Sequence, residues 1–272
     1  MVRTLLVRGM LAGVLGGLVA FGIAKTVGEP QVDKAIAFEE YVGARADARA
    51  GAHAGHQHDE ELVSRSQQDF AGLGAGTLIY GAALGGIFGL VFAIAYGRLG
   101  TFTARGTAAV LGLLGFVAIY LVPSLKYPAT PPAIGDPDTI GRRTNLYLAM
   151  ILISVVAVVL ALVLRKWLSY RIGEWNATIV VGLAYIAVMA VCFVALPGVN
   201  EVPQALLRGV VPANGGSSVT FPPVVLWRFR VSACAVQVGL WATVAIAFGY
   251  LAQRALESDP TTVEHNELSA PA

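Results

Sequence analysis

The sequence contains one dense group of side chains that could bind a metal ion. Residues 53–61 read HAGHQHDEE, so six potential ligands fall within nine positions, namely His53, His56, His58, Asp59, Glu60 and Glu61. Imidazole suits borderline divalent ions such as cobalt, nickel, zinc and copper, and carboxylates can complete the shell. The Ala/Gly-rich surroundings favour weak, exchangeable capture over a rigid structural site. The alternative is a solvated polar loop that happens to contain histidines.

A second set of candidates consists of isolated acids near the ends of the first and fifth apolar segments. These residues are Glu29, Glu39, Glu40 and Glu201. Carboxylates there could guide or bind a cation at the mouth of a pathway. Ordinary interfacial carboxylates or helix caps would look the same in the sequence.

Signatures of enzymes are missing from the sequence. It contains no GxxxxGK[ST] phosphate loop, no HExxH and no GxSxG, which predicts a protein that is not an enzyme and does not hydrolyse ATP by the phosphate-loop route. No basic run suggests nucleic acid, and no tightly bound cofactor is expected. Any energy input must therefore come from an ion gradient or from another subunit.

The elements that must position these groups are membrane-spanning helices. Of the 272 residues, 56% are hydrophobic and only 13% are charged, whereas globular domains carry roughly 25% charged residues. About 20 apolar residues span the hydrocarbon layer as a helix, and segments such as LISVVAVVLALVL lack the alternation of barrel strands. We expect an all-α polytopic membrane domain over residues 1–254, with a disordered polar tail at 255–272. The six expected spans are 9–27, 71–96, 106–122, 145–164, 177–196 and 231–251.

Orientation follows from the Lys and Arg residues of the loops. With the N-terminus in the cytoplasm, the inner segments hold eight of these residues and the outer loops hold ten. The outer loops (28–70, 123–144 and 197–230) are about twice as long, so the density of positive charge favours a cytoplasmic N-terminus. The first span also resembles a cleavable signal peptide, and cleavage would leave five spans with the same outer loops.

Few polar groups lie within the spans. Of the Asp, Glu, Lys, Arg and His residues, Lys25 is the one that falls within an expected span. The spans therefore lack the acids or histidines that a self-contained proton pump is expected to have. Cys192 and Cys234 could pass a transition metal but are more typical of packing residues.

Glycines recur at four-residue spacing in the first two spans. Gly9, Gly13 and Gly17 in one span and Gly81, Gly85 and Gly89 in the other place small residues along one face of each helix. Such faces let helix backbones approach closely, so we expect these two spans to pack as a rigid pair.

Several long motifs occur in a fixed order along the chain. They are GEPQVDKAIAFEE, ELVSRSQQ, AYGRLG, LVPSLKYPATPPAIGDPDTIGRRTNLYL, EWNA, NEVP and LWRFRVSA. In these motifs the sequence resembles the CbtA family, predicted cobalt transporter subunits of bacterial cytoplasmic membranes, over residues 1–254. Residues 205–222 look like an insertion, and the tail lies outside the pattern. The resemblance implies cobalt uptake linked to cobalamin synthesis, a small His-containing membrane partner of the CbtB type, and His53, His56 and His58 as candidate cobalt ligands.

The sequence thus favours a membrane subunit of an importer for a divalent transition metal, with cobalt(II) or a similar ion as cargo. The loop at 28–70 would concentrate the ion outside, and a pathway between the glycine-packed helices would pass it inward. The alternative is a non-transporting membrane scaffold or metal-sensing protein whose loops bind another protein.

Overall fold

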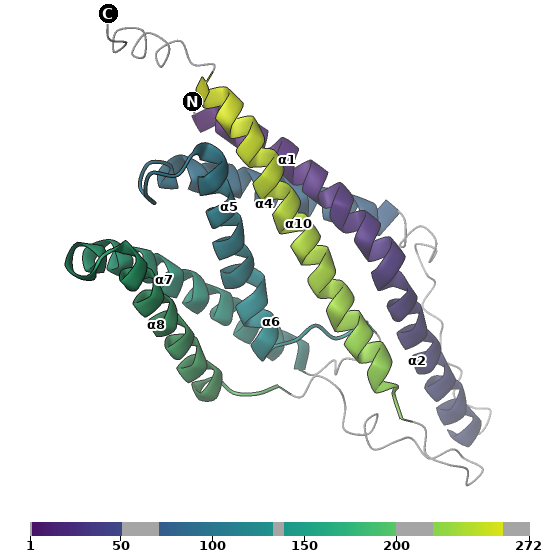
Figure 1. The fold of residues 1–272 in the computed structure, drawn as a ribbon. Helices are drawn as coiled ribbons and strands as arrows, with labels where there is room; N and C mark the ends of the chain where they lie inside the picture. Colours follow the sequence, from purple (N-terminus) through teal and green to yellow (C-terminus); the bar gives the residue numbers. More distant parts are fainter. Residues whose placement is uncertain (1, 51–70, 133–138, 200–219, 258–272) are drawn as a thin grey trace, which may run out of the picture. The chain divides into compact units, whose positions relative to one another are not determined.

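The computed structural model describes residues 2–50, 71–132, 139–199 and 220–257 (Figure 1). Within these ranges the chain is almost entirely helical and forms no strand, and six helices are long and apolar enough to cross a membrane. The expected all-α architecture with six spans is therefore confirmed. The spans are Val2–Val42, Leu73–Ala95, Ala104–Lys126, Ile140–Ile172, Glu174–Ala195 and Pro223–Glu257.

Several helices extend beyond the apolar stretches that mark them in the sequence. Residues 29–50, which the sequence placed in a loop, form helix α2 (Glu29–Ala50). Its sequence is rich in Ala, Glu and Arg, which have high helix propensity in water. Helix α7 (Ile140–Ile172) and helix α10 (Pro223–Glu257) likewise continue into segments expected as loops. Apolar content locates the part of a helix that lies in hydrocarbon, but does not locate the end of the helix.

Two π-helical segments each precede a proline within a continuous helical stretch. Segment η1 (Ala24–Gly28) joins α1 (Val2–Ile23) to α2 just before Pro30. Segment η3 (Phe116–Leu121) joins α5 (Ala104–Gly115) to α6 (Val122–Lys126) just before Pro123. A proline cannot donate to the carbonyl four residues earlier, and its ring clashes with that carbonyl. A wider helical turn before the proline accommodates both effects.

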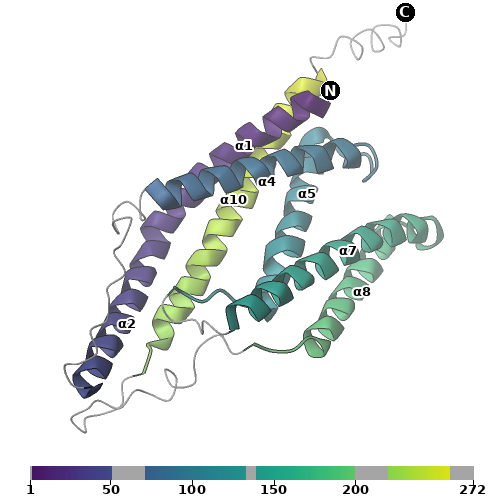
Figure 2. The ribbon, with the colours of Figure 1, turned by 180° about the vertical axis from the view of Figure 1, so that it is seen from behind.

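The chain divides into two compact units, and the first consists of Met1–Gly22, Phe70–Val117 and Val236–Ala272. In this unit α4 (Leu73–Ala95) crosses α1 (Figure 2). A Cβ atom added to Gly13 would overlap the carbonyl oxygen of Gly81, and one added to Gly9 would overlap that of Gly85. The backbones are in direct contact, which confirms the rigid pair expected from the glycine spacing.

The C-terminal part of α10 completes the first unit. Phe248 packs edge-on against Phe88 and Phe92 of α4, with ring centroids 5.3 and 4.9 Å away. On α5, Gly115 leaves room for the ring of Trp241, which would collide with a Cβ atom there. Helix α10 therefore contacts α4 through edge-on aromatic rings, and α5 through an aromatic ring set against a glycine.

The second unit consists of Ile23–Asp69 and Ala118–Ala235. Its main feature is a hairpin of α7 and α8 (Glu174–Ala195), which runs through Gly173 with a φ of 82° that favours glycine. Inside the hairpin the hydroxyl groups of Ser154 and Tyr185 share a hydrogen bond of 2.7 Å. Ser154 is fully buried, so this bond satisfies a polar group that lipid could not.

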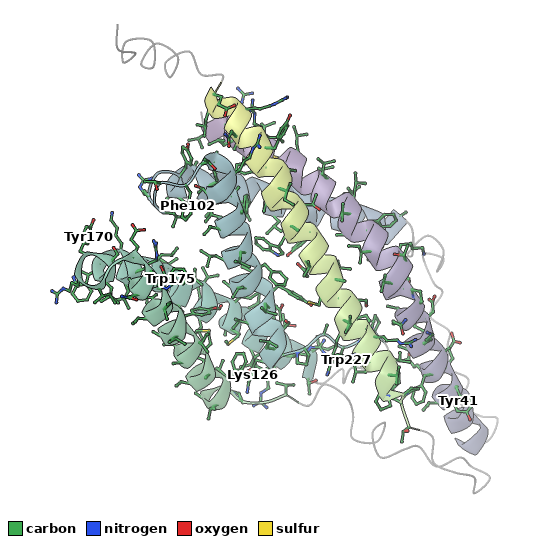
Figure 3. All side chains as sticks on the ribbon, in the orientation of Figure 1. Tyr41, Phe102, Lys126, Tyr170, Trp175 and Trp227 are labelled. Atoms are coloured by element: carbon green, nitrogen blue, oxygen red, sulfur yellow. The ribbon has the colours of Figure 1, made fainter. Side chains whose placement is uncertain are left out.

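Aromatic side chains mark the turn of this hairpin as a membrane–water boundary. Tyr170 is 81% exposed and Trp175 is 77% exposed, and both lie beside the turn (Figure 3). The Arg171 guanidinium lies 4.4 Å from the centre of the Trp167 ring. Amphipathic rings and cations of this kind concentrate at the headgroup level. The opposite end of the hairpin, where α7 begins and α8 ends, then approaches the other boundary.

Candidate functional site

The candidate metal ligands of the long loop cannot be located in the structure. His53, His56, His58, Asp59, Glu60, Glu61 and Glu201 all lie outside the described residues. Among the residues that are described, no group of three or more His, Cys, Asp or Glu side chains could hold a metal ion. The loop histidines therefore stay a prediction.

The three remaining candidate acids lie on α2. Glu29 is half-buried near the start of the helix, and Glu39 and Glu40 are exposed further along it. Ten residues separate Glu29 from Glu39, which places their backbones about 15 Å apart along the helix axis. One ion cannot be coordinated by both ends of such a row. As a set, these acids could attract cations in succession but could not chelate a single one.

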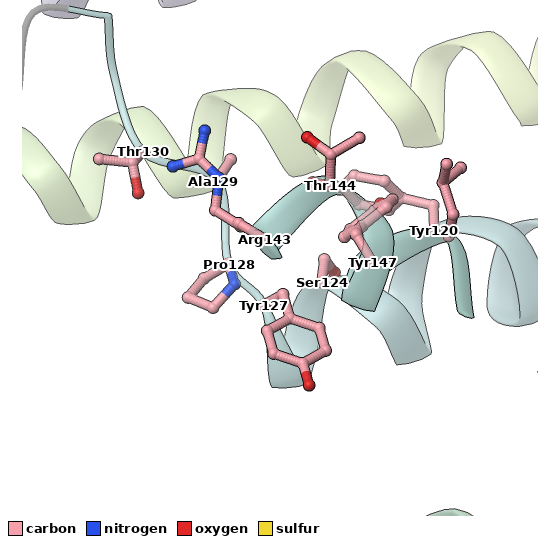
Figure 4. Close-up of a pocket in the computed structure, with 10 residues that line it drawn as sticks. Tyr120, Ser124, Tyr127, Pro128, Ala129, Thr130, Arg143, Thr144 and Tyr147 are labelled. Atoms are coloured by element: carbon pink, nitrogen blue, oxygen red, sulfur yellow. The ribbon is translucent and has the colours of Figure 1, made fainter. Parts of the chain in front are cut away.

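A polar cavity of the second unit lies where α6 ends and α7 begins, and is called the Arg143 cavity here. Its volume is about 340 Å³. Figure 4 shows its lining, with the Arg143 side chain reaching toward Ala129. The lining residues are Tyr120, Ser124, Tyr127, Pro128, Ala129, Thr130, Arg143, Thr144, Tyr147 and Leu148. Among these described residues Arg143 carries the one charged side chain, and it is positive.

Hydrogen bonds hold the wall of this cavity in place. The Lys126 ammonium donates to the Phe193 carbonyl oxygen at 2.6 Å, and the Tyr127 hydroxyl donates to the Pro197 carbonyl oxygen at 2.9 Å. Nε of Arg230 donates to the Ala129 carbonyl oxygen at 3.2 Å. Burial raises the pKa of the Tyr127 hydroxyl, against an opposing effect of Arg142, so this phenol stays protonated and donates its hydrogen bond at neutral pH.

A second polar cavity, called the Gln237 cavity here, lies within the first unit among membrane-spanning helices. It encloses about 290 Å³. Its lining consists of Ala20, Gly72, Leu73, Gly76, Thr77, Tyr80, Val236, Gln237 and Leu240. The Gln237 Oε1 atom is buried and finds no hydrogen-bond partner among the described residues. Thr77 is occupied, because its hydroxyl donates to the carbonyl oxygens of Leu73 and Gly74.

The described lining of the Gln237 cavity contains neutral oxygen atoms and no carboxylate. An ion that loses its hydration water there could be coordinated by these neutral oxygen atoms. An unpaired amide oxygen in an apolar span is energetically unfavourable. The cost is removed when a water molecule or ligand donates a hydrogen bond to the oxygen, or when the oxygen coordinates a cation. Such a site could bind a cation weakly, which suits passage better than storage.

A further cavity, lined by residues of α7 and α8, has few polar side chains. Its volume is about 510 Å³, and its lining is largely aliphatic, with Trp167 and Tyr185 among the exceptions. In a bilayer, lipid tails fill an open apolar groove of this kind.

Sequence reasoning did not name Tyr80, Thr77, Gln237 or Arg143 as site residues. What it could not supply was their grouping, because Tyr80 and Gln237 lie more than 150 residues apart in the chain. The available signal was the pair Arg142–Arg143 at the start of a span in an outer loop, where positive charge is less frequent.

Six membrane-spanning helices with small polar cavities between them define a multi-pass helical membrane protein. The chain belongs to the family described as probable cobalt transporter subunit (CbtA), whose model matches residues 2–253. No curated protein matches the chain, and no solved structure does.

Proposed function

We propose that this chain is the multi-pass membrane subunit of a transporter that carries cobalt(II) into bacterial cells for cobalamin synthesis. The observation that carries the proposal is the family match over residues 2–253, which takes in nearly all of the six candidate spans found among the described residues. The N-terminus would lie in the cytoplasm and the protein in the cytoplasmic membrane. A small His-containing subunit of the CbtB type is the proposed partner.

The polar helix α2, which ends the first span, and the outer segment after it would concentrate the ion. The carboxylates on α2 and the histidines and acids of residues 53–61 would raise the local cobalt concentration through weak binding. Weak binding suits this role, because an ion that is held tightly outside cannot move on. The chain would catalyse no reaction and would hold no permanent cofactor.

The Gln237 cavity is the proposed intermediate stop within the membrane. The family match points to an ion as cargo, and this cavity combines space for several waters with an unpaired amide oxygen. The tight contact between α1 and α4 makes their interface an unsuitable route, because their backbones leave no room for an ion. The sequence predicted an ion path between the glycine faces of these helices. We place the proposed path through the neighbouring Gln237 cavity instead.

Uptake of cobalt-57 tests the proposal. Cells that lack other cobalt importers would express the chain with its partner, and nickel and zinc would serve as competitors. We expect higher accumulation than in cells with an empty vector, reduced most by unlabelled cobalt. Unchanged uptake, despite confirmed membrane insertion of both proteins, would contradict the proposal.

Substitution of the loop histidines separates transport from a scaffold role. The triple variant His53→Ala, His56→Ala and His58→Ala should take up cobalt several-fold more slowly at low concentration. The single variant His265→Ala, in the tail beyond the family match, is the matched control and should behave as the wild type. Normal uptake in the triple variant with loss of the partner in co-purification would instead favour a scaffold.

A further inference from the structure

We propose that the Arg143 cavity is a binding site for a phosphate group, and that the headgroup of an anionic phospholipid supplies it. The inference is independent of the transport function, because it rests on the cavity of the second unit alone. It begins with Arg143 itself. The Nη1 atom of this residue is buried and has no hydrogen-bond partner among the residues that the structure describes.

An unpaired guanidinium N–H is more costly than an unpaired neutral group. A charged donor removed from water loses more hydration free energy than an amide or a hydroxyl does. The first turn of α7, which carries Arg143, holds no acidic residue, and no carboxylate of a described residue lines the cavity. Arg142 precedes Arg143 and adds a second positive charge. An acceptor that carries negative charge would therefore recover the most free energy.

Two other cations near the cavity, Lys126 and Arg230, are already engaged. Lys126 donates to the Phe193 carbonyl oxygen, and Nε of Arg230 donates to that of Ala129. These bonds close the wall of the cavity and leave Arg143 as the lining cation with a free donor. A guanidinium presents its N–H groups in a planar fork that matches phosphate geometry.

The lining of the cavity fits a headgroup better than a bare metal ion. No described residue of the lining has a carboxylate, and the positive charge of Arg143 repels a divalent cation such as cobalt(II). Thr144 and Ser124 contribute hydroxyl groups, while Pro128 and Leu148 contribute apolar surface. At about 340 Å³ the cavity is far larger than the roughly 30 Å³ share of one water molecule. A phosphate and part of the glycerol therefore fit.

The depth of the cavity indicates the source of the phosphate. It is formed by the last residues of one candidate span (Ala104–Lys126) and the first residues of the next (Ile140–Ile172). The ends of spans lie at the level of lipid phosphates. A basic pocket between transmembrane helices at this level is a recognised form of site for lipid headgroups.

Binding to the purified full-length protein in a neutral detergent tests the inference. The probes are dioleoyl phosphatidylglycerol, dioleoylglycerol, which lacks the phosphate, and inorganic phosphate. The readouts are the midpoint of thermal unfolding and the number of lipids retained in native mass spectrometry. We expect phosphatidylglycerol to raise the midpoint and to be retained, whereas dioleoylglycerol does neither. A shift with inorganic phosphate alone supports the phosphate site and assigns it to the free ion.

The variant Arg143→Gln, with Arg142→Gln as the matched control, locates the site. Removal of the Arg143 charge should weaken binding of phosphatidylglycerol at least tenfold, whereas loss of the exposed neighbouring charge should change it less than threefold. Equal binding by the two variants would overturn the proposal. If Arg143→Gln does not fold, the wild-type protein still tests the proposal. Equal effects of phosphatidylglycerol and dioleoylglycerol on the unfolding midpoint, with no effect of inorganic phosphate, would also overturn the proposal.

Discussion

The ammonium of Lys126 and the backbone carbonyl oxygen of Phe193 are joined by a hydrogen bond of 2.6 Å, which links the end of α6 to the last turn of α8. The last four carbonyl groups of a helix have no partner within the helix, and a cation there is favourable. The neighbouring Tyr127 makes the second link, to Pro197. Adjacent residues thus fix the same end of the α7–α8 hairpin.

Removal of the Lys126 charge should loosen this end of the second unit. The variant Lys126→Met keeps much of the apolar stem but leaves the Phe193 carbonyl without its donor. We expect a loss of about 1.5–3 kcal/mol, the usual size for a hydrogen bond to a charged group, measured as a lower thermal midpoint in detergent. Lys166→Met, at an exposed position of α7, should leave the midpoint unchanged. Equal midpoints for the two variants would contradict the assignment.

The contact between α1 and α4 should not tolerate a methyl group. In Gly13→Ala the new Cβ would overlap the Gly81 carbonyl oxygen, and backbone cannot move aside as a side chain can. We expect a cost of about 1–3 kcal/mol or more, seen as a large fall in the yield of folded protein. In Gly76→Ala, on the partner helix α4, the added Cβ meets nothing within 4 Å. A yield from Gly13→Ala that matches Gly76→Ala would show that the helices are further apart.

The hydrogen bond between Ser154 and Tyr185 should make a modest contribution to the hairpin. Tyr185→Phe removes the phenol oxygen and leaves the buried Ser154 hydroxyl without this partner. Interhelical hydrogen bonds in membranes contribute about 0.6 kcal/mol on average and up to about 1.7 kcal/mol. We expect a fall in stability within that range by reversible unfolding in mixed micelles. Tyr170→Phe, at the exposed turn, should cause none, and a larger fall there than at Tyr185 would refute the prediction.

Cobalt passage should depend on the amide oxygen of Gln237. Gln237→Leu keeps similar bulk but removes the unpaired Oε1 from the cavity, so cobalt-57 uptake should fall about tenfold at equal protein levels. Gln253→Leu, on the same helix α10 and outside the cavity lining, is the control and should transport normally. Normal transport by Gln237→Leu would remove the cavity from the proposed pathway but would leave the transporter assignment intact.

The spans and the glycine contact could be predicted because both depend on residues that are close together in the sequence. A run of about 20 apolar residues identifies a membrane-spanning helix, and the spacing of Gly9, Gly13 and Gly17 identifies a face. The ends of the helices could not be predicted in the same way. Residues 29–50 are too polar for hydropathy to detect, and their helix depends on propensity and on the wide turn before Pro30.

The candidate sites were less accessible to sequence reasoning. The cavities bring together residues such as Tyr80 and Gln237, whose proximity depends on how α4 and α10 pack. The unpaired state of Arg143 depends on its neighbours already bonding elsewhere, as Arg230 does with Ala129. Residues 53–61 made the clearest chemical pattern in the sequence, and they lie outside the described part of the chain.

The glycine contact between α1 and α4 also has a bioenergetic consequence. If the chain transports a metal ion as proposed, it must still hold back protons and sodium ions, which are far more abundant and are driven inward by the membrane potential. Backbone in direct contact with backbone excludes water, so no hydrated wire can form along that interface. If so, a side chain that separated the Gly9–Gly85 and Gly13–Gly81 contacts would be expected to raise the leak of protons through the protein.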